Sequence, residues 1–229
     1  MLEVVLNIPY WFELMATVTA AVSGAMVATR ARYDIFGVIV ITIITGLFGA
    51  IFRDILLQDY GIYAFQHPQL IIACVITGLV VFYFGQLVTY LSRVVDVVDT
   101  LSLGMWGVIT VGKALSAGLT IVPAIMLAAI ASVGGGIVRD ALMGRPISAF
   151  QPGSLYGTAA VVGSTVFALM KTYGILEPYA AIICVVLVSL IRLSSLLFGI
   201  STKPSHDLSM PLLDAMSKPI DALTHKEDS

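Results

Sequence analysis

The chain has 229 residues, of which 59% are hydrophobic and only 11% are charged, and its mean hydropathy is +0.99. A soluble domain carries about 25% charged residues, so this composition excludes a water-soluble globule. The formal net charge of -2 gives no electrostatic basis for binding nucleic acid. The sequence contains no metalloprotease, phosphate-loop or hydrolase-nucleophile string, so we expect no enzyme activity, no bound metal and no organic cofactor.

Seven segments are long and apolar enough to cross a bilayer as helices, which takes about 20 residues. In chain order these are 8–28, 35–57, 68–91, 97–119, 121–143, 153–171 and 178–198. The predicted fold class is therefore an all-α membrane protein with seven transmembrane helices in residues 1–200. Residues 201–229 are polar and interrupted by prolines, which predicts a separate tail.

The basic residues are unevenly distributed between the two ends of these helices. The connections after the first, third and fifth helices and the tail hold Arg30, Arg32, Arg93, Arg145, Lys203, Lys218 and Lys226. The opposite ends have little beyond Arg53 and Lys171. Because lysine and arginine accumulate on the cytoplasmic side of membrane proteins, we expect the N-terminus outside and the tail in the cytoplasm.

An internal repeat appears when the sequence is shifted by 86 positions. GAIFRDIL at 49–56 then aligns with GGIVRDAL at 135–142, with five identities in eight positions, and Glu13 aligns with Asp99. Because each repeat holds three helices, an odd number, the second must enter the membrane from the opposite side. This predicts two inverted repeats, at 10–91 and 97–171, followed by an extra helix. Chance similarity of apolar strings is the alternative, and the shared Arg-Asp pair argues against it.

Two adjacent pairs of charged residues lie inside predicted spans, Arg53–Asp54 and Arg139–Asp140. Neighbours on a helix point about 100° apart, so we expect neither arginine to pair with the aspartate that follows it. The helix directions place Glu13 near Arg53 outside and Asp99 near Arg139 inside, which predicts one ion pair at each face. The alternative is that these charges mark helix ends and reach the lipid headgroups.

Glycines gather at matching places in the second and fifth predicted helices: Gly46, Gly49, Gly134, Gly135 and Gly136. Each glycine lowers helix stability by roughly 1 kcal/mol relative to alanine, so we expect both helices to depart from regular geometry there. Carbonyls exposed at such a point would suit a cation path. Close helix packing is the alternative role. Hydroxyl groups are further candidates for lining the path, namely Thr42, Thr45 and Ser132.

The seven helices, the three-plus-three repeat and the paired strings GAIFRD and GGGIVRD resemble the prokaryotic members of the trimeric intracellular cation (TRIC) channel family, over about residues 10–198. The resemblance implies a homotrimer in the inner membrane, with one pore for monovalent cations, chiefly potassium, in each protomer. It also implies that the second and fifth helices bend at their glycines and line the pore. Permeant potassium or sodium ions and a bound lipid are then the expected ligands. The same class of sequence has been labelled a glycine transporter, so a secondary transporter for a small amino acid such as glycine is the alternative.

Lys113 is the only lysine well inside a predicted span, about 14 residues or roughly 21 Å along the helix from Asp99. Its counterpart in the first repeat is Val27, so this charge breaks the internal symmetry. We expect its ammonium to face the pore and oppose cations, or else to reach outward to the interface. The resemblance points the same way, because animal relatives are thought to use a lysine on the fourth helix in gating.

Overall fold

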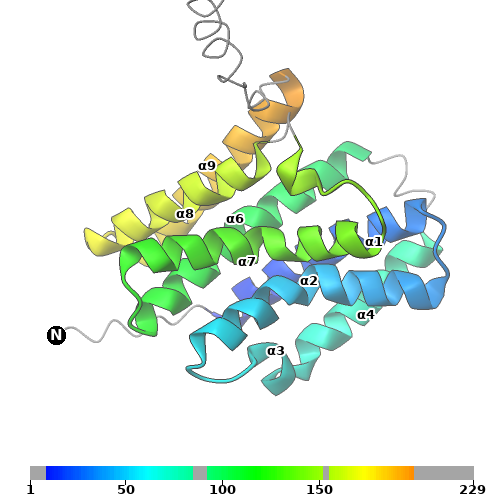
Figure 1. Cartoon of the computed structure of the whole chain (residues 1–229), viewed down its shortest axis with the longest axis horizontal. Helices are drawn as coiled ribbons and strands as arrows, with labels where there is room; N and C mark the ends of the chain where they lie inside the picture. The colour runs from blue at the N-terminus through cyan, green and yellow to red at the C-terminus, as the bar shows by residue number, and fades with distance from the viewer. Residues whose placement is uncertain (1–8, 85–91, 152–154, 199–229) are drawn as a thin grey trace, which may run out of the picture.

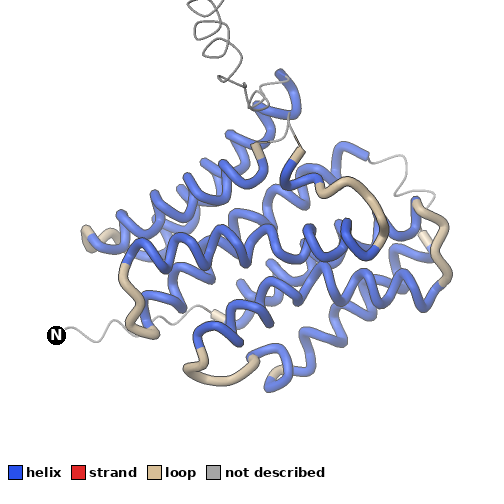
Figure 2. The backbone as a smooth tube through the Cα atoms, viewed as in Figure 1, coloured by secondary structure: helices blue, strands red, loops and turns tan. Residues whose placement is uncertain are grey.

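The structure is a computed structural model that describes residues 9–84, 92–151 and 155–198. Within those ranges it is entirely helical, with eight α-helices, one short 3-10 helix and no strand (Figures 1 and 2). The end of the third predicted span, the start of the sixth and the predicted tail lie outside the described residues.

The described helices follow the order of the predicted spans. The first half of the chain holds α1 (Tyr10–Arg30), α2 (Ile35–Leu57), α3 (Tyr63–Gln66) and α4 (Pro68–Tyr83). The second half holds α6 (Ser92–Ser116), α7 (Ile121–Leu142), the 3-10 helix η1 (Ser148–Phe150), α8 (Tyr156–Thr172) and α9 (Glu177–Phe198). Each predicted span overlaps one of these helices, whereas α3 and η1 were not predicted. Four of the described helices, α1, α2, α7 and α9, are each long and apolar enough to cross a membrane.

Local sequence signals explain where α2 and α4 begin and end. The Asp34 carboxylate caps α2 by accepting a hydrogen bond of 2.8 Å from the backbone N–H of Gly37. Gln58 ends the helix in the left-handed conformation, at φ 51°. Pro68 occupies the first turn of α4, where a missing N–H costs little.

The helices form two groups of three that pack against each other (Figure 1). In the first group α1, α2 and α4 contact one another, and in the second α6, α7 and α8 do so. The groups meet chiefly where α1 packs on α6 and α2 packs on α7. Each of those contacts joins two helices that the 86-residue shift makes equivalent. Of the two remaining α-helices, the short α3 contacts α2 and α4, and α9 packs on α6 and α8.

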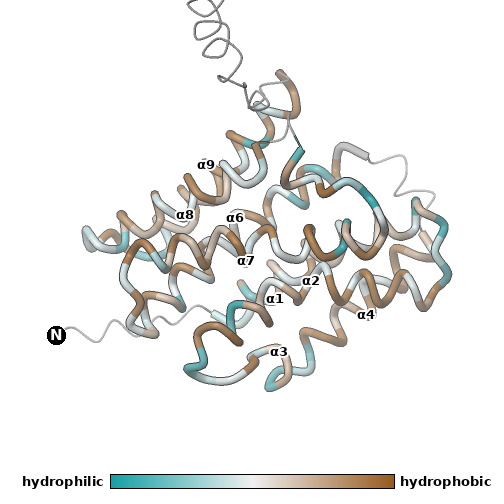
Figure 3. The backbone as a smooth tube through the Cα atoms, viewed as in Figure 1, coloured by the Kyte–Doolittle hydropathy of each residue, from teal (hydrophilic) through white to brown (hydrophobic). Residues whose placement is uncertain are grey.

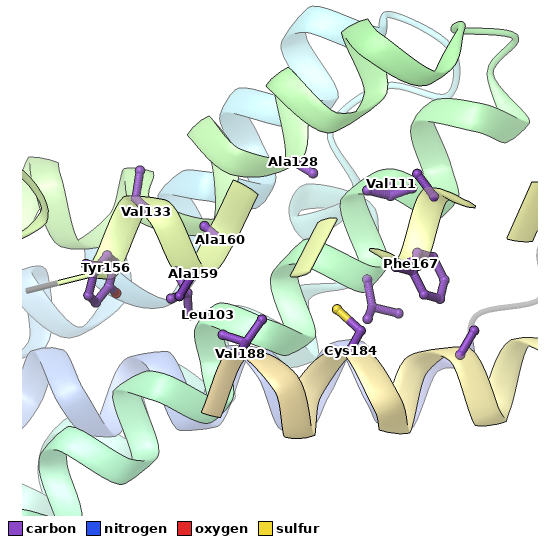
Figure 4. Close-up of a cluster of buried hydrophobic side chains, with 13 residues drawn as sticks. Leu103, Val111, Ala128, Val133, Tyr156, Ala159, Ala160, Phe167, Cys184 and Val188 are labelled. Atoms are coloured by element: carbon purple, nitrogen blue, oxygen red, sulfur yellow. The ribbon is translucent and has the colours of Figure 1, made fainter. Parts of the chain in front are cut away.

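The largest apolar core lies in the second group, where α9 covers α6 and α8 (Figure 4). Val188 and Cys184 of α9 point toward α8, and the Cys184 thiol donates a hydrogen bond of 3.2 Å to the carbonyl of Gly163. Phe167 of α8 is buried in the same cluster. This core fixes α9 to the second group.

Apolar residues are frequent along α4 and α9, which are largely brown in Figure 3, and many of them are exposed. Every fourth residue is exposed along one face of each helix: Ile72, Ile76 and Val80 on α4, and Ile182, Val186 and Leu190 on α9. Apolar stripes of this length are unfavourable in water and suit contact with lipid or with another apolar surface. Polar and charged side chains instead gather between the helices.

Candidate functional site

The centre of the molecule is the crossing of α2 and α7, where the two backbones touch. A Cβ atom added at Gly49 would overlap the carbonyl oxygen of Ala131, and one added at Gly135 would overlap the carbonyl oxygen of Thr45. The 86-residue shift exchanges these two contacts, because it converts Thr45 into Ala131 and Gly49 into Gly135. At both points only hydrogen fits between the helices, so glycine is required by close approach.

Neither α2 nor α7 is interrupted at its glycines, and a bend of either helix there stays a prediction. Both helices run without interruption through their glycines, from Ile35 to Leu57 and from Ile121 to Leu142. The contacts across the crossing offset the low helix propensity of glycine, and the apolar neighbours on both sides keep the backbone helical. Gly46 also serves packing, since its Cβ would lie 2.8 Å from the sulfur of Cys74. Gly46, Gly49 and Gly135 therefore let helices approach one another closely.

The hydroxyl groups proposed as path-lining candidates are buried and bonded to their own helices. Thr42, Thr45 and Ser132 donate to the carbonyl four residues earlier, at 2.6, 2.7 and 2.6 Å. The hydroxyl hydrogens are thus used, while the oxygen lone pairs remain available to accept a hydrogen bond or to coordinate a cation.

A small cavity lies beside the crossing, with a free volume of about 10 Å³. This is about the space that one water molecule needs. Its lining combines residues from α1, α2, α6, α7 and α8: Ala20, Thr45, Gly49, Asp99, Ser102, Trp106, Ala131, Ser132, Gly135, Gly136 and Tyr156. Several predicted site residues are therefore brought together here, around a cavity that is too small to hold a hydrated ion.

Two clusters of charged residues lie at opposite ends of the α2–α7 pair. The Glu13 cluster comprises Glu13, Arg53, Asp54, Tyr60, Tyr63 and Lys113. The Asp99 cluster comprises Ser23, Asp99, Arg139, Asp140 and Ser148. Among the described residues, nearly all buried charged side chains therefore lie at the two ends of the crossing.

Arg53 organises the Glu13 cluster and is fully buried. Its Nε lies 2.7 Å from Asp54 Oδ1, and its Nη2 lies 3.1 Å from Glu13 Oε1. The same Glu13 oxygen accepts a hydrogen bond of 2.8 Å from Lys113 Nζ. Two cations and two carboxylates therefore neutralise one another away from water, as buried charges must.

Asp54 also fixes the loop that follows α2. The Tyr60 hydroxyl donates to Asp54 Oδ1 at 2.8 Å, and the backbone N–H of Tyr63 donates to Asp54 Oδ2 at 3.0 Å. Burial raises the pKa of Tyr60 above its usual value, so the phenol stays protonated and keeps donating. This holds α3 against the end of α2.

The Asp99 cluster repeats this arrangement at the other end. Arg139 Nε lies 2.8 Å from Asp140 Oδ1, and its Nη1 lies 3.8 Å from Asp99 Oδ1. Ser23 bridges Asp99 and Arg139, since its hydroxyl donates a hydrogen bond to Asp99 at 2.7 Å and accepts one from Arg139 Nη1 at 3.2 Å. Ser148 donates its backbone N–H and its hydroxyl to Asp140 Oδ2, at 3.0 and 2.7 Å.

The two predicted ion pairs, Glu13–Arg53 and Asp99–Arg139, are both present. The expectation that neither arginine pairs with the following aspartate is wrong, because Nε of Arg53 and Nε of Arg139 each contact that residue. An arginine side chain is long enough to fold back beside its neighbour, so the angle between adjacent Cβ atoms does not decide the pairing. One guanidinium then holds two carboxylates at once.

The Lys113 side chain turns into the Glu13 cluster. Its ammonium lies 2.8 Å from buried Glu13 and 3.9 Å from the centre of the Tyr63 ring, and the side chain is only 15% exposed. The pair was not predicted from the sequence, in which Glu13 precedes Lys113 by 100 positions. Ser23, Tyr60 and Tyr63 were also not predicted as site residues. A signal for Tyr63 and Ser148 was present, since each directly precedes one of the two matching AFQ strings of the repeat.

Replacing Ser23 with alanine is expected to lower the free energy of unfolding by about 1.5–3 kcal/mol, because hydrogen bonds to two charged groups are lost. Thr19→Ala is the matched control on α1, since the Thr19 hydroxyl bonds only to carbonyls of its own helix. Denaturant unfolding of both purified variants measures the difference. Equal effects would show that Ser23 does not bridge Asp99 and Arg139.

A comparison with family models matches the chain twice to the family described as Glycine transporter, over residues 10–86 and 96–172. The second match begins 86 positions after the first, which is the shift found in the sequence. Among relatives, the chain is 29% identical to the inner membrane protein YadS of Escherichia coli K12, covering 82% of this chain and 91% of that protein. It is 27% identical to a membrane protein of Deinococcus radiodurans, over 68% of this chain and 73% of that one.

Solved structures of cation channels have the same fold. The TRIC trimeric intracellular cation channel orthologue from Rhodobacter sphaeroides superposes with a TM-score of 0.80 at 25% identity, covering 85% of this chain and 100% of that one. A second structure, which concerns conductance through TRIC cation channels, superposes with a TM-score of 0.79 at 24% identity, covering 87% of this chain and 98% of that one. A trimeric intracellular cation channel from C. elegans with bound Ca²⁺ superposes with a TM-score of 0.59 at 16% identity, covering 85% of this chain and 93% of that one.

Proposed function

The chain belongs to the Glycine transporter family and has the fold of the prokaryotic TRIC channels, and on that premise we propose that it is a cation-permeable channel of the inner membrane. The observation that carries the proposal is the polar cavity at the α2–α7 crossing, between two buried charge clusters. Buried charges between apolar helices typically mark an ion or substrate pathway. The permeant ions are monovalent, with potassium as the main one.

The path runs through a single protomer, between its two three-helix groups. Thr45 and Ser132 supply hydroxyl oxygens at the cavity, and Asp99 supplies a carboxylate with a 16% exposed side chain. Oxygen ligands of this kind replace part of the hydration shell of a monovalent cation. Because the cavity holds about one water molecule, the conformation described here is closed, and conduction requires α2 and α7 to separate.

The two groups are proposed to be inverted repeats related by an axis in the membrane plane. The support is that contacts between the groups pair equivalent helices, and that Gly49 and Gly135 exchange places at the crossing. The Glu13–Arg53 ion pair joins the start of α1 to the end of α2. In the same way, the Asp99–Arg139 ion pair joins the start of α6 to the end of α7. Seven spans with the N-terminus outside and the C-terminus in the cytoplasm follow from this arrangement and from the basic residues.

The working assembly is proposed to be a homotrimer with one path in each protomer. The orthologue from Rhodobacter sphaeroides is described as trimeric, and this chain covers all of it. The apolar faces of α4 and α9 offer surface for other protomers and for lipid. Chemical crosslinking of the protein in liposomes tests the assembly, and a monomer or dimer as the largest product contradicts a trimer.

The functional test is ion flux through purified protein in liposomes. We expect potassium loaded inside to leave down its gradient, faster than from protein-free liposomes, with electrically driven flux in either direction. Labelled glycine outside the same liposomes is expected to remain outside. Saturable glycine uptake without potassium conductance would overturn the channel and establish the transporter.

That transporter is the second candidate, and one observation favours it. The unbroken helices α2 and α7 close the centre of the molecule by direct backbone contact, with charge clusters on either side. Alternating access between two such sides is the mechanism that inverted repeats commonly support. A small amino acid such as glycine is then the substrate, as the description of the family suggests.

Lys113→Ala is expected to raise potassium flux several-fold. The substitution removes one of the two cations that neutralise Glu13, so the carboxylate gains negative potential that attracts cations. Lys171→Ala is the control, because Lys171 pairs with the partly exposed Glu177 at the end of α8. Unchanged flux in Lys113→Ala would show that this ammonium does not oppose cations.

A further inference from the structure

The ammonium of Lys113 lies in an enclosure built by other parts of the chain. Glu13 Oε1 of α1 accepts its hydrogen bond at 2.8 Å, the Tyr63 ring of α3 lies 3.9 Å away, and the Tyr60 ring lies 5.1 Å away. A carboxylate combined with aromatic faces is a typical recognition site for an ammonium group. Lys113 itself comes from the last turn of α6.

The walls of this enclosure are held in place without the lysine. Arg53 Nη2 fixes the Glu13 carboxylate at 3.1 Å, and Asp54 holds both the Tyr60 hydroxyl and the Tyr63 backbone N–H. The Tyr63 ring also packs 4.0 Å from the ring of His67. A site whose walls are fixed beforehand loses little conformational freedom when its ligand binds.

We propose that Glu13, Tyr60 and Tyr63 form a binding site for a primary ammonium group, which Lys113 fills in this structure and which a small free amine takes when the lysine leaves. The free amine is an alkylammonium ion or the ammonium group of an amino acid. The proposal concerns binding and does not depend on whether the protein conducts ions.

The chemistry of the walls favours an ammonium over an alkali metal ion. The enclosure offers one carboxylate oxygen and two aromatic faces, whereas an alkali metal ion is held by a ring of oxygen atoms. An ammonium group directs its N–H bonds to the carboxylate and places its charge and adjacent methylene against the rings. Because the lysine is tethered to α6, a free amine competes with it only at a high concentration, so the test removes the lysine.

The test uses full-length Lys113→Ala in detergent and measures the thermal midpoint of unfolding. This substitution removes three methylenes and the ammonium, the shape of n-propylammonium. At about ten times its dissociation constant, n-propylammonium is expected to raise the midpoint by about 3–6 °C, saturably. Glycine is tested in the same way, and comparing it with n-propylammonium shows whether the site prefers an amino acid or a simple amine. Sodium chloride at equal concentration is expected to leave the midpoint unchanged.

Two matched variants show whether the enclosure is the site. Lys113→Met fills the same space without charge, and Lys113→Ala combined with Tyr63→Leu removes an aromatic wall, so neither is expected to respond. A saturable shift with either amine, absent from both variants, supports the proposal. No shift with either amine, an equal shift with sodium, or a shift that survives Tyr63→Leu overturns it. If Lys113→Ala folds only when n-propylammonium is present, the proposal is supported. If Lys113→Met folds but Lys113→Ala does not fold even with n-propylammonium, the proposal is overturned.

Discussion

Replacing Arg53 with alanine is expected to lower the free energy of unfolding by about 3–5 kcal/mol. The guanidinium is fully buried and binds Asp54 through Nε and Glu13 through Nη2. Among the residues that the structure describes, its removal leaves Asp54 without an ion pair and leaves Glu13 paired with Lys113 alone. Arg53→Lys is expected to recover only part of the loss, because one ammonium cannot reproduce two directed contacts.

Unfolding of purified protein by a denaturing detergent measures this effect, with Lys171→Ala as the control. Lys171 pairs with Glu177 at 2.6 Å, but the Glu177 side chain is 35% exposed, so its loss is expected to cost at most about 1 kcal/mol. Equal costs for Arg53→Ala and Lys171→Ala would show that the Glu13 cluster contributes no more than a surface ion pair.

Replacing Gly135 with alanine is expected to lower the free energy of unfolding by about 2–3 kcal/mol, which is typical of overpacking. The added Cβ would overlap the carbonyl oxygen of Thr45, so α2 and α7 must separate. Gly49→Ala is expected to have the same effect against Ala131. Both variants pull apart the contact that closes the centre of the molecule.

The neighbouring glycines provide matched controls in the same helix. A Cβ at Gly134 or at Gly136 would find its nearest atom at 3.7 Å, which is an ordinary contact. Alanine there is expected to be neutral or to stabilise the protein by up to about 1 kcal/mol through helix propensity. If all three substitutions in α7 had the same effect, close approach at Gly135 would not be the reason for the glycine.

The sequence predicted the helices well because apolar length is a local signal. It also predicted the Glu13–Arg53 and Asp99–Arg139 pairs, since the repeat and the helix directions together fix which ends meet. It did not predict α3 or η1, because a single turn of helix has no hydrophobic period of its own. Their place is set by Asp54 and Asp140, whose carboxylates hold the loop backbone.

The errors at the site have physical causes of two kinds. The interruption of α7 expected at Gly134–Gly136 followed from helix propensity, which describes an isolated helix and not one packed on another. The bond between Arg53 and Asp54 was excluded by the angle between neighbouring residues, which neglects the reach of arginine. Lys113 and Ser23 find partners 100 and 76 positions away, so only the packed structure identifies them.

The central claim is that cations pass the α2–α7 crossing of each protomer, and Ser132 tests it most directly because it lines the cavity there. The two native cysteines, Cys74 and Cys184, are buried and are replaced by alanine to give a thiol-free background. Ser132→Cys is then tested with Ag⁺, a thiol-reactive monovalent cation close to potassium in size. Val161→Cys, on an exposed apolar position of α8, is the control. We expect Ag⁺ to abolish potassium flux irreversibly in Ser132→Cys and to leave the thiol-free protein and Val161→Cys conducting. Flux that continues in Ser132→Cys after its thiol has reacted would contradict a path through the crossing.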